Sequence, residues 1–505
     1  MELSSIFLLS SLIFVILFLK LTTGKSTSLV KLPPGPRKLP LIGHLHLLVS
    51  SDPAHHVFKD LALKYGPDLM HLKLGEVSTI IVSSSEMAKE LFRTHDITFA
   101  YRPSSFSAET FSYNFTDIGL APYGEYWRQV RKLCTLELLS TNRVQSFRPI
   151  REEEFYNLCR WIASKEGSLI NLSEKVNLTT YDIIMRTSLG KKTGEAAAFI
   201  SIMKETNELS FGFHIVDLYP SIKLFRWTSG LGRKIEAIHQ KSDRILENII
   251  SNHKAKAIDD STDREDLIDV LLKFHADAGG EISLTNNNLK GILLDMFTGG
   301  SETSSTTVNW VMAELLKNPR IMEKVKEEVR RVYDEQGYVD ESFLHELKYL
   351  KLVIKEGLRL HPPLPLLIPR ENRYEKIITG GYEIPLKTRL MVNAWAIGRD
   401  PKNWKEPERF FPERFLENPP DFNGNSFQYL PFGAGRRICP GMVFGLANVE
   451  LPLAMLLYHF DWTLPQGLKP EELTMAETLG MVSARKDHLH LIPTVRKPLL
   501  IKENK

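Results

Sequence analysis

Cysteine is scarce in this chain, and its positive and negative charges nearly cancel. Its 505 residues include three cysteines, Cys134, Cys159 and Cys439. Such an odd, sparse set argues against a disulfide framework and favours a reducing compartment. A net charge of +3 is too small to indicate a nucleic-acid partner. The body has no internal repeat and no linker that would divide it, so we expect one large domain where length alone would allow about three.

Long apolar runs are absent from most of the chain, but residues 3–19 form one. A helix of about 17 residues is about 26 Å long, just enough to cross a bilayer core. A cleaved signal peptide is the alternative, but the chain starts Met1-Glu2 rather than with basic residues, and no small-residue cleavage site follows. Basic residues follow the run and place the body on the cytosolic side: Lys20, Lys25, Lys31, Arg37 and Lys38.

We therefore predict an uncleaved transmembrane anchor at residues 1–22. Residues 23–40 are basic and contain the sequence LPPGP at 32–36. Consecutive prolines stiffen the backbone and cannot continue a helix. This segment is predicted to be a hinge between the anchor and a body that spans residues 41–505.

A glycine-rich loop with one cysteine, residues 431–441 (PFGAGRRICPG), precedes an apolar and helical run at 442–458. Cys439 therefore lies where a helix begins, and the free N–H groups and helix dipole there favour a thiolate. One thiolate without a partner cysteine suits an axial iron ligand better than a disulfide or a four-ligand zinc site. Gly435 and Gly441 would let the backbone approach a flat cofactor, whose acidic edge Arg437 could reach. The alternative is a plain loop that holds a buried cysteine.

Residues 284–317 are predicted to form one long helix with a weak middle, because TGGSETSSTT occupies 298–307. Each glycine inside a helix costs about 1 kcal/mol relative to alanine. Successive hydroxyl groups also compete for the backbone. A weak stretch between strong apolar flanks indicates function, although a helix break with a polar turn would look similar.

These motifs resemble those of the cytochrome P450 family. The pattern Phe432-x-x-Gly435-x-Arg437-x-Cys439-x-Gly441 is similar to the haem-ligand loop of that family. Four further family motifs occur in the family's order, so the resemblance covers nearly the whole chain: W-x-x-x-R at Trp127 and Arg131, the acid–alcohol pair Glu302-Thr303, E-x-x-R at Glu356 and Arg359, and P-E-R-F at 412–415. The implied fold is mainly α with small β-sheets, preceded by a single anchor helix.

The resemblance also implies roles for individual residues. Cys439 would be the metal ligand of haem b, and Glu302 with Thr303 would be the catalytic pair that relays protons. Glu356, Arg359 and Arg414 would form a structural network behind the haem loop. Gly299 replaces the alanine common at its position and should leave extra room above the haem. The side chains expected to bind the haem propionates are Trp127, Arg131, Arg370 and Arg437.

The implied activity is monooxygenation of a hydrophobic plant metabolite by an enzyme in the endoplasmic reticulum membrane. It would use O2 and NADPH electrons from a separate NADPH–cytochrome P450 reductase. We expect a sesquiterpene or diterpene as substrate, because no ionised side chain stands out in the predicted pocket. The alternatives are an alkaloid, a phenolic or flavonoid substrate, or a non-catalytic haem-binding protein. The predicted pocket residues are Phe106, Phe111, Phe115, Phe211, Phe213, Leu366, Leu367, Met481 and Val482.

Overall fold

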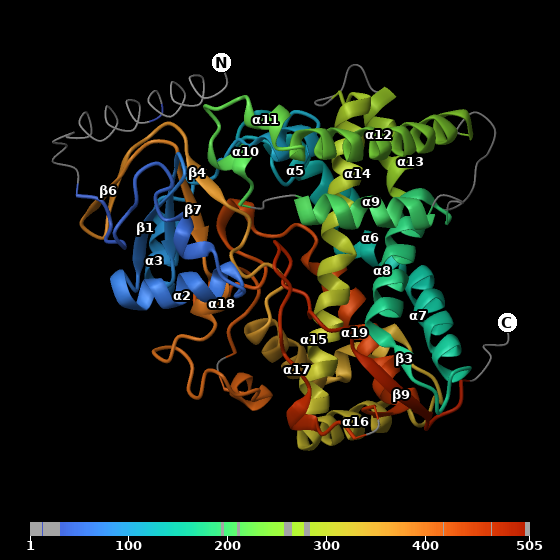
Figure 1. Ribbon diagram of the computed structural model, residues 1–505. Helices are drawn as coiled ribbons and strands as arrows, with labels where there is room; N and C mark the ends of the chain where they lie inside the picture. Colours follow the sequence, from blue (N-terminus) through green and yellow to red (C-terminus); the bar gives the residue numbers. More distant parts are fainter. Residues whose placement is uncertain are drawn as a thin grey trace, which may run out of the picture.

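The fold is mainly helical, and its largest β-sheet lies at one side of the helical body (Figure 1). This confirms the predicted class of mainly α with small sheets. The computed structural model describes Ile13 and residues 31–192, 196–209, 213–256, 265–276, 283–417, 419–465 and 467–499. The predicted anchor, apart from Ile13, and the first part of the hinge lie outside the described residues.

Helices carry most of the described chain. Those before residue 260 are α2 (Ala54–Tyr65), α3 (Ser85–Lys89), α4 (Phe106–Phe111), α5 (Glu125–Leu133), α6 (Thr141–Ser146), α7 (Arg148–Ala163), α8 (Leu172–Leu189), α9 (Ala196–Leu209), α10 (Ile215–Leu218), α11 (Phe225–Thr228) and α12 (Leu231–Lys256). Those after it are α13 (Leu267–Ala276), α14 (Asn286–Gly300), α15 (Glu302–Lys317), α16 (Pro319–Tyr333), α17 (Lys348–Leu360), α18 (Ala394–Ile397) and α19 (Met442–His459).

The largest sheet joins distant parts of the chain in the order β1-β2-β7-β4. Its first two strands, β1 (Leu69–Leu74) and β2 (Val77–Val82), form an antiparallel hairpin. Strand β7 (Thr388–Val392) pairs in parallel with β2 and antiparallel with β4 (Arg370–Asn372). This pairing brings Arg370 from the second half of the chain to the N-terminal sheet.

Two smaller sheets complete the β-structure of the described residues. One is β3-β9-β8, from β3 (Ile170–Asn171), β8 (Phe460–Thr463) and β9 (His490–Val495). The other is the hairpin of β5 (Ile377–Thr379) and β6 (Tyr382–Ile384). Gly380 and Gly381 form the turn of this hairpin, with φ of 57° and 76°. Such positive φ angles suit glycine.

The core is a bundle in which α15 packs against α8, α17 and α19. Helix α19 follows the cysteine loop (residues 431–441) and confirms the helix predicted at 442–458. Among the described residues, α19 alone is long and apolar enough to cross a membrane, but 67% of it is buried inside the fold. We therefore interpret α19 as a core helix that fixes the position of the cysteine loop.

The helix predicted at 284–317 is two helices, α14 and α15, which meet at Ser301. The reason is local: two glycines precede Ser301, and hydroxyl groups around it bond to the backbone. Ser301 Oγ donates to the carbonyl of Phe297 at 2.7 Å, and Thr303 Oγ1 donates to that of Gly299 at 2.7 Å. The weak stretch predicted from the sequence is therefore the junction of two helices.

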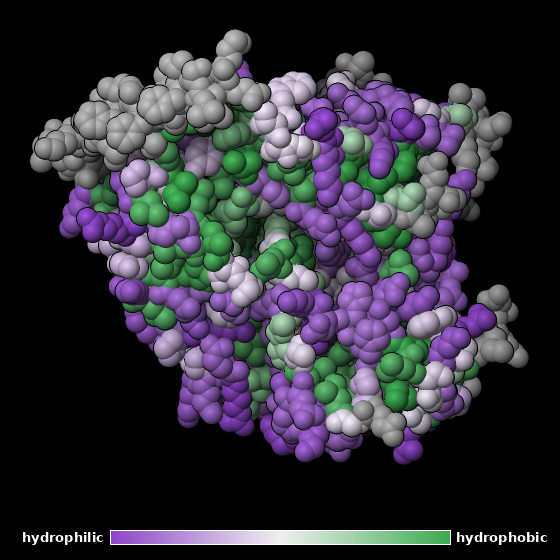
Figure 2. Space-filling model, in the orientation of Figure 1, coloured by the Kyte–Doolittle hydropathy of each residue, from purple (hydrophilic) through white to green (hydrophobic). Residues whose placement is uncertain are grey.

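The second part of the predicted hinge rests on the body. The carbonyl of Pro34 accepts a hydrogen bond from the His71 amide of β1 at 2.8 Å. A Cβ atom on Gly35 would lie 2.2 Å from the His71 carbonyl oxygen, so only glycine allows this approach. On the face shown in Figure 2, hydrophobic surface gathers over this sheet and around a hollow beside it.

Candidate active site

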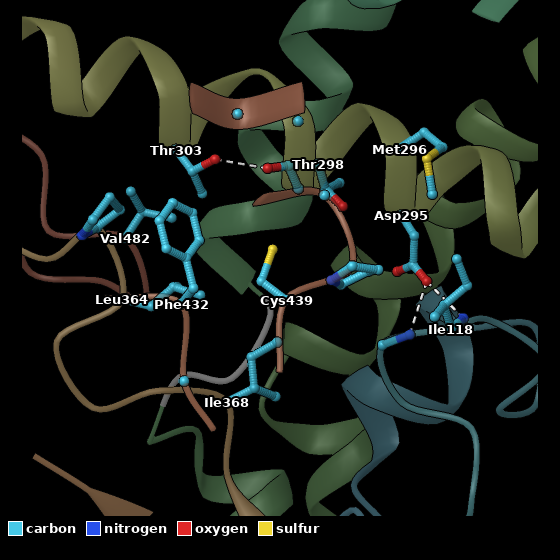
Figure 3. A pocket seen from close by; sticks show the side chains of 18 of the residues that line it. Ile118, Asp295, Met296, Thr298, Thr303, Leu364, Ile368, Phe432, Cys439 and Val482 are labelled. Atoms are coloured by element: carbon cyan, nitrogen blue, oxygen red, sulfur yellow. Dashed lines mark hydrogen bonds between the residues drawn. The ribbon is translucent and has the colours of Figure 1, made fainter. Parts of the chain in front are cut away.

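A cavity with a volume of about 320 Å³ lies between the α14–α15 junction and the cysteine loop. Figure 3 shows the sulfur of Cys439 pointing across it toward the two helices that carry Thr298 and Thr303. Its apolar walls come from many parts of the chain: Phe111, Ile118, Leu120, Leu139, Ile184, Leu267, Leu294, Met296, Leu358, Leu364, Leu367, Ile368, Phe432, Phe444, Leu446, Val449, Met481 and Val482.

Two glycines with positive φ and backbone hydrogen bonds hold the shape of the cysteine loop. Gly433 and Gly435 have φ of 70° and 67°, and the Cys439 amide donates to the Phe432 carbonyl at 2.9 Å. Gly441 lines the cavity, and a Cβ atom there would meet nothing within 4 Å. Gly435 does not line it, because its Cβ would instead lie 2.4 Å from Asp96 Oδ1. Of the two glycines predicted to admit a flat cofactor, only Gly441 therefore faces the cavity.

Burial raises the pKa of the Cys439 thiol. The Gly441 amide and the charge of Arg131 act in the opposite direction but do not outweigh burial. The start of a helix is thus weaker support for a thiolate than the sequence suggested. A cation bound to the sulfur would supply the missing stabilisation.

Four buried or half-buried arginines line one side of the cavity: Arg102, Arg131, Arg370 and Arg437. Burial lowers the pKa of each guanidinium, to about 9 for Arg437 and about 10 for Arg370. The sequence analysis missed Arg102, which has no motif around it.

The guanidinium groups mostly have neutral partners. Arg437 donates to the carbonyls of Ala100, Ile118 and Ala121 at 2.8, 3.3 and 2.5 Å. Arg131 donates to that of Ile438 at 2.5 Å. Arg370 differs, because it pairs with Asp96 at 3.1 Å. Within the described residues no carboxylate forms an ion pair with Arg102, Arg131 or Arg437, so this side of the cavity suits an anionic ligand.

Trp127 is not part of the cavity wall. Its indole Nε1–H donates to the carbonyl of Ile118 at 3.0 Å, and its ring packs against the guanidinium of Arg437, with the Arg437 Cζ 4.3 Å from the ring centroid. Trp127 and Arg131 share a helix as predicted, with the Arg131 Cζ 5.9 Å from the indole centroid. In this structure Trp127 supports the arginines instead of offering its N–H group to a ligand.

The two residues of the predicted acid–alcohol pair, Glu302 and Thr303, lie in different environments. Thr303 lines the cavity, whereas Glu302 does not. The Glu302 carboxylate accepts a hydrogen bond from the Asn207 amide of α9. Burial raises the pKa of Glu302, and the bond from Asn207 partly offsets that rise.

The predicted network behind the cavity is present. Arg359 binds Glu356 through Nε and Nη2, at 2.7 and 2.9 Å, and Arg414 Nε binds the same carboxylate at 3.0 Å. Arg359 Nη1 also donates to the carbonyls of Gly398 and Pro407, at 2.6 and 2.7 Å. Every oxygen of the buried Glu356 is thus satisfied, as a buried charge requires.

The predicted pocket residues are partly correct. Phe111, Leu367, Met481 and Val482 line the cavity, and Phe211 lies outside the described residues. Phe106, Phe115, Phe213 and Leu366 do not line it.

No ionised side chain stood out among the pocket segments predicted from the sequence, but Asp117 and Asp295, which lie outside those segments, are on the cavity wall together with Arg102. A lone acid within the apolar stretch ILLDMF at 292–297 was the signal that could have identified Asp295.

This cavity fits a haem group. Cys439 could bind the iron, Gly441 leaves space for the ring, and guanidinium groups without carboxylate partners could hold the propionates.

Comparison with known proteins agrees with this fit. The family model named Cytochrome P450 matches residues 33–491. Salviol synthase of Salvia pomifera is 51% identical over 98% of both chains, and tabersonine 16-hydroxylase 1 of Catharanthus roseus is 51% identical over 92% of this chain and 91% of that one. A zebra fish cytochrome P450 solved with progesterone has a TM-score of 0.75 at 26% identity, over 88% of this chain and 99% of that one.

These relatives are enzymes, so the alternative of a non-catalytic haem-binding protein is set aside. Haem is the cofactor of the family, and its members act on hydrophobic substrates with O2 and a redox partner. The cysteine loop, the cavity and these matches together show that the chain belongs to the cytochrome P450 family and is a haem-dependent monooxygenase.

Proposed function

We propose that this enzyme hydroxylates a terpenoid, either a sesquiterpene or a diterpene. The observation that carries the proposal is the wall of the cavity, which is apolar over most of its area and open above Cys439 at Gly299. Apolar burial contributes about 25 cal/mol per Å², so a fused-ring hydrocarbon would bind there without needing charged partners. The position of Gly299 would let a bulky skeleton approach the reacting centre.

When bound, the haem would supply the activation of dioxygen and the transfer of one oxygen atom to the substrate. We assign Cys439 as the residue that holds the iron. Arg131, Arg370 and Arg437, together with Arg102, would hold the propionates by charge-assisted hydrogen bonds. Each of these guanidinium groups already lines the cavity.

Thr303 is assigned to proton delivery. Its hydroxyl proton points to the Gly299 carbonyl, which leaves the lone pairs of Oγ1 free to accept a proton from a neighbouring donor. Glu302 would have to release Asn207 before its carboxyl group could act with Thr303. We therefore propose that movement of α9, which carries Asn207, accompanies proton delivery.

We further propose that the enzyme is held at the endoplasmic reticulum membrane and receives NADPH electrons through NADPH–cytochrome P450 reductase. Exposed apolar residues support membrane contact, because they gather on two segments that touch each other. The hydroxyl of Tyr219 donates to the Leu41 carbonyl at 3.4 Å, which joins the two segments. The exposed residues are Leu39, Leu41 and Ile42 on one segment and Ile222, Leu224 and Trp227 on the other.

An alkaloid substrate is the second candidate, because Asp295 on the cavity wall could pair with an ammonium group. Yeast microsomes that contain the enzyme and a reductase would be given terpenes and amine alkaloids in parallel. The proposal expects NADPH-dependent products and a spin-state change of the haem with a terpene. Product and spin-state change with the amines alone would overturn the terpenoid assignment and leave the monooxygenase.

A further inference from the structure

Two acidic side chains meet on the cavity wall, outside every motif discussed above. Asp295 is on α14, and Asp117 belongs to the segment that follows α4. Figure 3 shows Asp295 beside Ile118, on the same side of the cavity as Met296. Both side chains line the cavity; Asp117 is buried, whereas Asp295 keeps part of its surface accessible.

One oxygen of each carboxyl group is fully used by the backbone. Asp295 Oδ2 accepts from the amides of Ile118 and Gly119 at 2.7 and 2.9 Å. Asp117 Oδ1 accepts from the amides of Leu120 and Ala121, both at 2.9 Å. The other two oxygens, Asp295 Oδ1 and Asp117 Oδ2, both lie near Gly119, at 3.3 and 3.8 Å from the position of a Cβ atom there.

These two oxygens can share a proton. Burial raises the pKa of Asp295 to about 6, and burial together with the charge of Asp295 raises the pKa of Asp117 well above its usual range. The two carboxyl groups are hydrogen-bonded to each other, so the pair keeps one proton and one negative charge near neutral pH. Each carboxyl oxygen has two lone pairs, and a shared proton uses one of them on Asp295 Oδ1.

The surrounding charges decide what the remaining lone pair can accept. Arg102 and Arg437 act on the pair from the same side of the cavity and favour its ionised form. With haem bound, the propionates would neutralise these guanidinium groups, so the pair would keep its single negative charge. A hydroxyl donor would gain a charge-assisted hydrogen bond from that charge.

We propose that Asp295, with Asp117 as its proton-sharing partner, forms a binding subsite for a hydroxyl group of the substrate. This inference rests on the proposed function and narrows it: the substrate is an apolar skeleton that already carries a hydroxyl group. The reaction that supplies the substrate is then an earlier oxygenation or the addition of water to a hydrocarbon. Asp295 thereby also fixes which carbon faces Cys439.

The test uses ligands that bind haem iron whatever the natural substrate is. The haem-loaded enzyme is titrated with 4-phenylimidazole and 4-biphenylylimidazole, and with analogues that carry a hydroxyl or a methoxy group at each free ring position. Binding is followed by the absorption shift of the haem. Hydrogen bonds to charged groups contribute enough for about a tenfold gain in affinity. We expect that gain for at least one hydroxyl analogue and not for its methoxy counterpart.

Two variants separate the acceptor role from the support of the backbone. In Asp295→Asn the amide oxygen can still accept from Ile118 and Gly119, while an NH2 group replaces the free acceptor, so the hydroxyl preference should disappear. In Asp117→Asn the NH2 group can take the place of the shared proton, so the preference should remain. Thermal unfolding would show that both variants are folded.

The inference is overturned if no hydroxyl analogue exceeds its parent by more than twofold in the wild type, or if the preference survives in Asp295→Asn. The proposed function fails separately, if product and a spin-state change appear with the amines alone in the microsomal assay described above.

Discussion

Gly299 and Gly300 are neighbours in α14, yet a methyl group would meet different surroundings at the two positions. A Cβ atom on Gly299 would have no other atom within 4 Å, whereas one on Gly300 would lie 2.6 Å from Cδ1 of Ile184. Gly299 lines the cavity opposite Cys439. Both glycines line the cavity, but only at Gly300 would the methyl group also press on a neighbouring side chain.

Gly299→Ala should fold at least as stably as the wild type, because alanine is favoured over glycine in helices by up to about 1 kcal/mol. Its methyl group should lower turnover of a bulky terpene several-fold or shift the oxidised carbon, as chromatography of the products would show. Gly300→Ala should instead lose about 1–3 kcal/mol by overpacking. If Gly299→Ala leaves the turnover rate and the product pattern unchanged, the open space at Gly299 does not help to admit the substrate.

Cys439→Ser should lose the absorption signature that a thiolate-bound haem gives with carbon monoxide. Cys134 and Cys159 are buried and do not line the cavity. Cys134→Ser and Cys159→Ser should keep the signature, although each buries a hydroxyl group at a cost of about 1–3 kcal/mol. A Cys439→Ser enzyme with an intact signature would refute the site as described.

Thr303→Ala should keep its haem and its NADPH consumption but divert much of the reducing power to hydrogen peroxide. Without the hydroxyl group, no side chain holds a proton at the position of Thr303 Oγ1. Thr298→Ala is the matched control, because Thr298 also lines the cavity and donates to a helix carbonyl, that of Leu294, at 2.8 Å. The ratio of product to NADPH measures the effect, and equal ratios in both variants would remove Thr303 from proton delivery.

Glu356→Gln should destabilise the enzyme by about 3–5 kcal/mol, because it leaves Arg359 buried without its charge partner. The variant should also retain haem poorly, since the network lies behind the cysteine loop. Glu406→Gln is the control: Glu406 pairs with Arg409 at 3.2 Å on the surface, where an ion pair contributes less than about 1 kcal/mol. Denaturant unfolding of both variants would test this, and similar midpoints would argue against the role of the network.

The membrane orientation can be tested at Asn114, which is exposed and starts the glycosylation sequon N-F-T. With a cytosolic body this site should remain unmodified. Two further sequons are poorer reporters of orientation, because their asparagine side chains are already engaged. Asn171 caps α8, and Asn177 donates to Ser305 Oγ at 3.1 Å. A version directed into the lumen by a cleavable signal peptide serves as a positive control. A mobility shift of the native protein on endoglycosidase treatment would contradict the orientation.

Local patterns were enough to predict several elements of the fold. The apolar run after the glycine-rich loop predicts α19, and the apolar flanks of residues 298–307 predict the helical stretch that forms α14 and α15. The resemblance to the family supplied the placement of Cys439 and Thr303 on one cavity and of Glu356 with Arg359 and Arg414. Each of these features follows from a short local pattern or from a family motif.

The features missed by the sequence analysis depend on contacts between distant segments. Asp117 and Asp295 come together only because the segment after α4 packs on α14. Glu302 faces away from the cavity because α9 brings Asn207 to it. Trp127 faces a backbone carbonyl because the segment after α4 passes over α5. Periodicity says which residues share a helix face, but it does not say which carbonyl or amide that face will meet.

Val482 is part of the cavity wall but is among the last residues to be synthesised, so the wall is completed late in translation. A ribosome adds about 5–20 residues per second, so roughly 20–80 seconds separate the synthesis of Arg102 from that of Val482. During that interval the chain lacks residues that complete the cavity wall in the folded protein. The haem can therefore be enclosed only when translation is nearly finished, and a messenger that stops before Met481 would yield a protein whose haem stays open to water on that side.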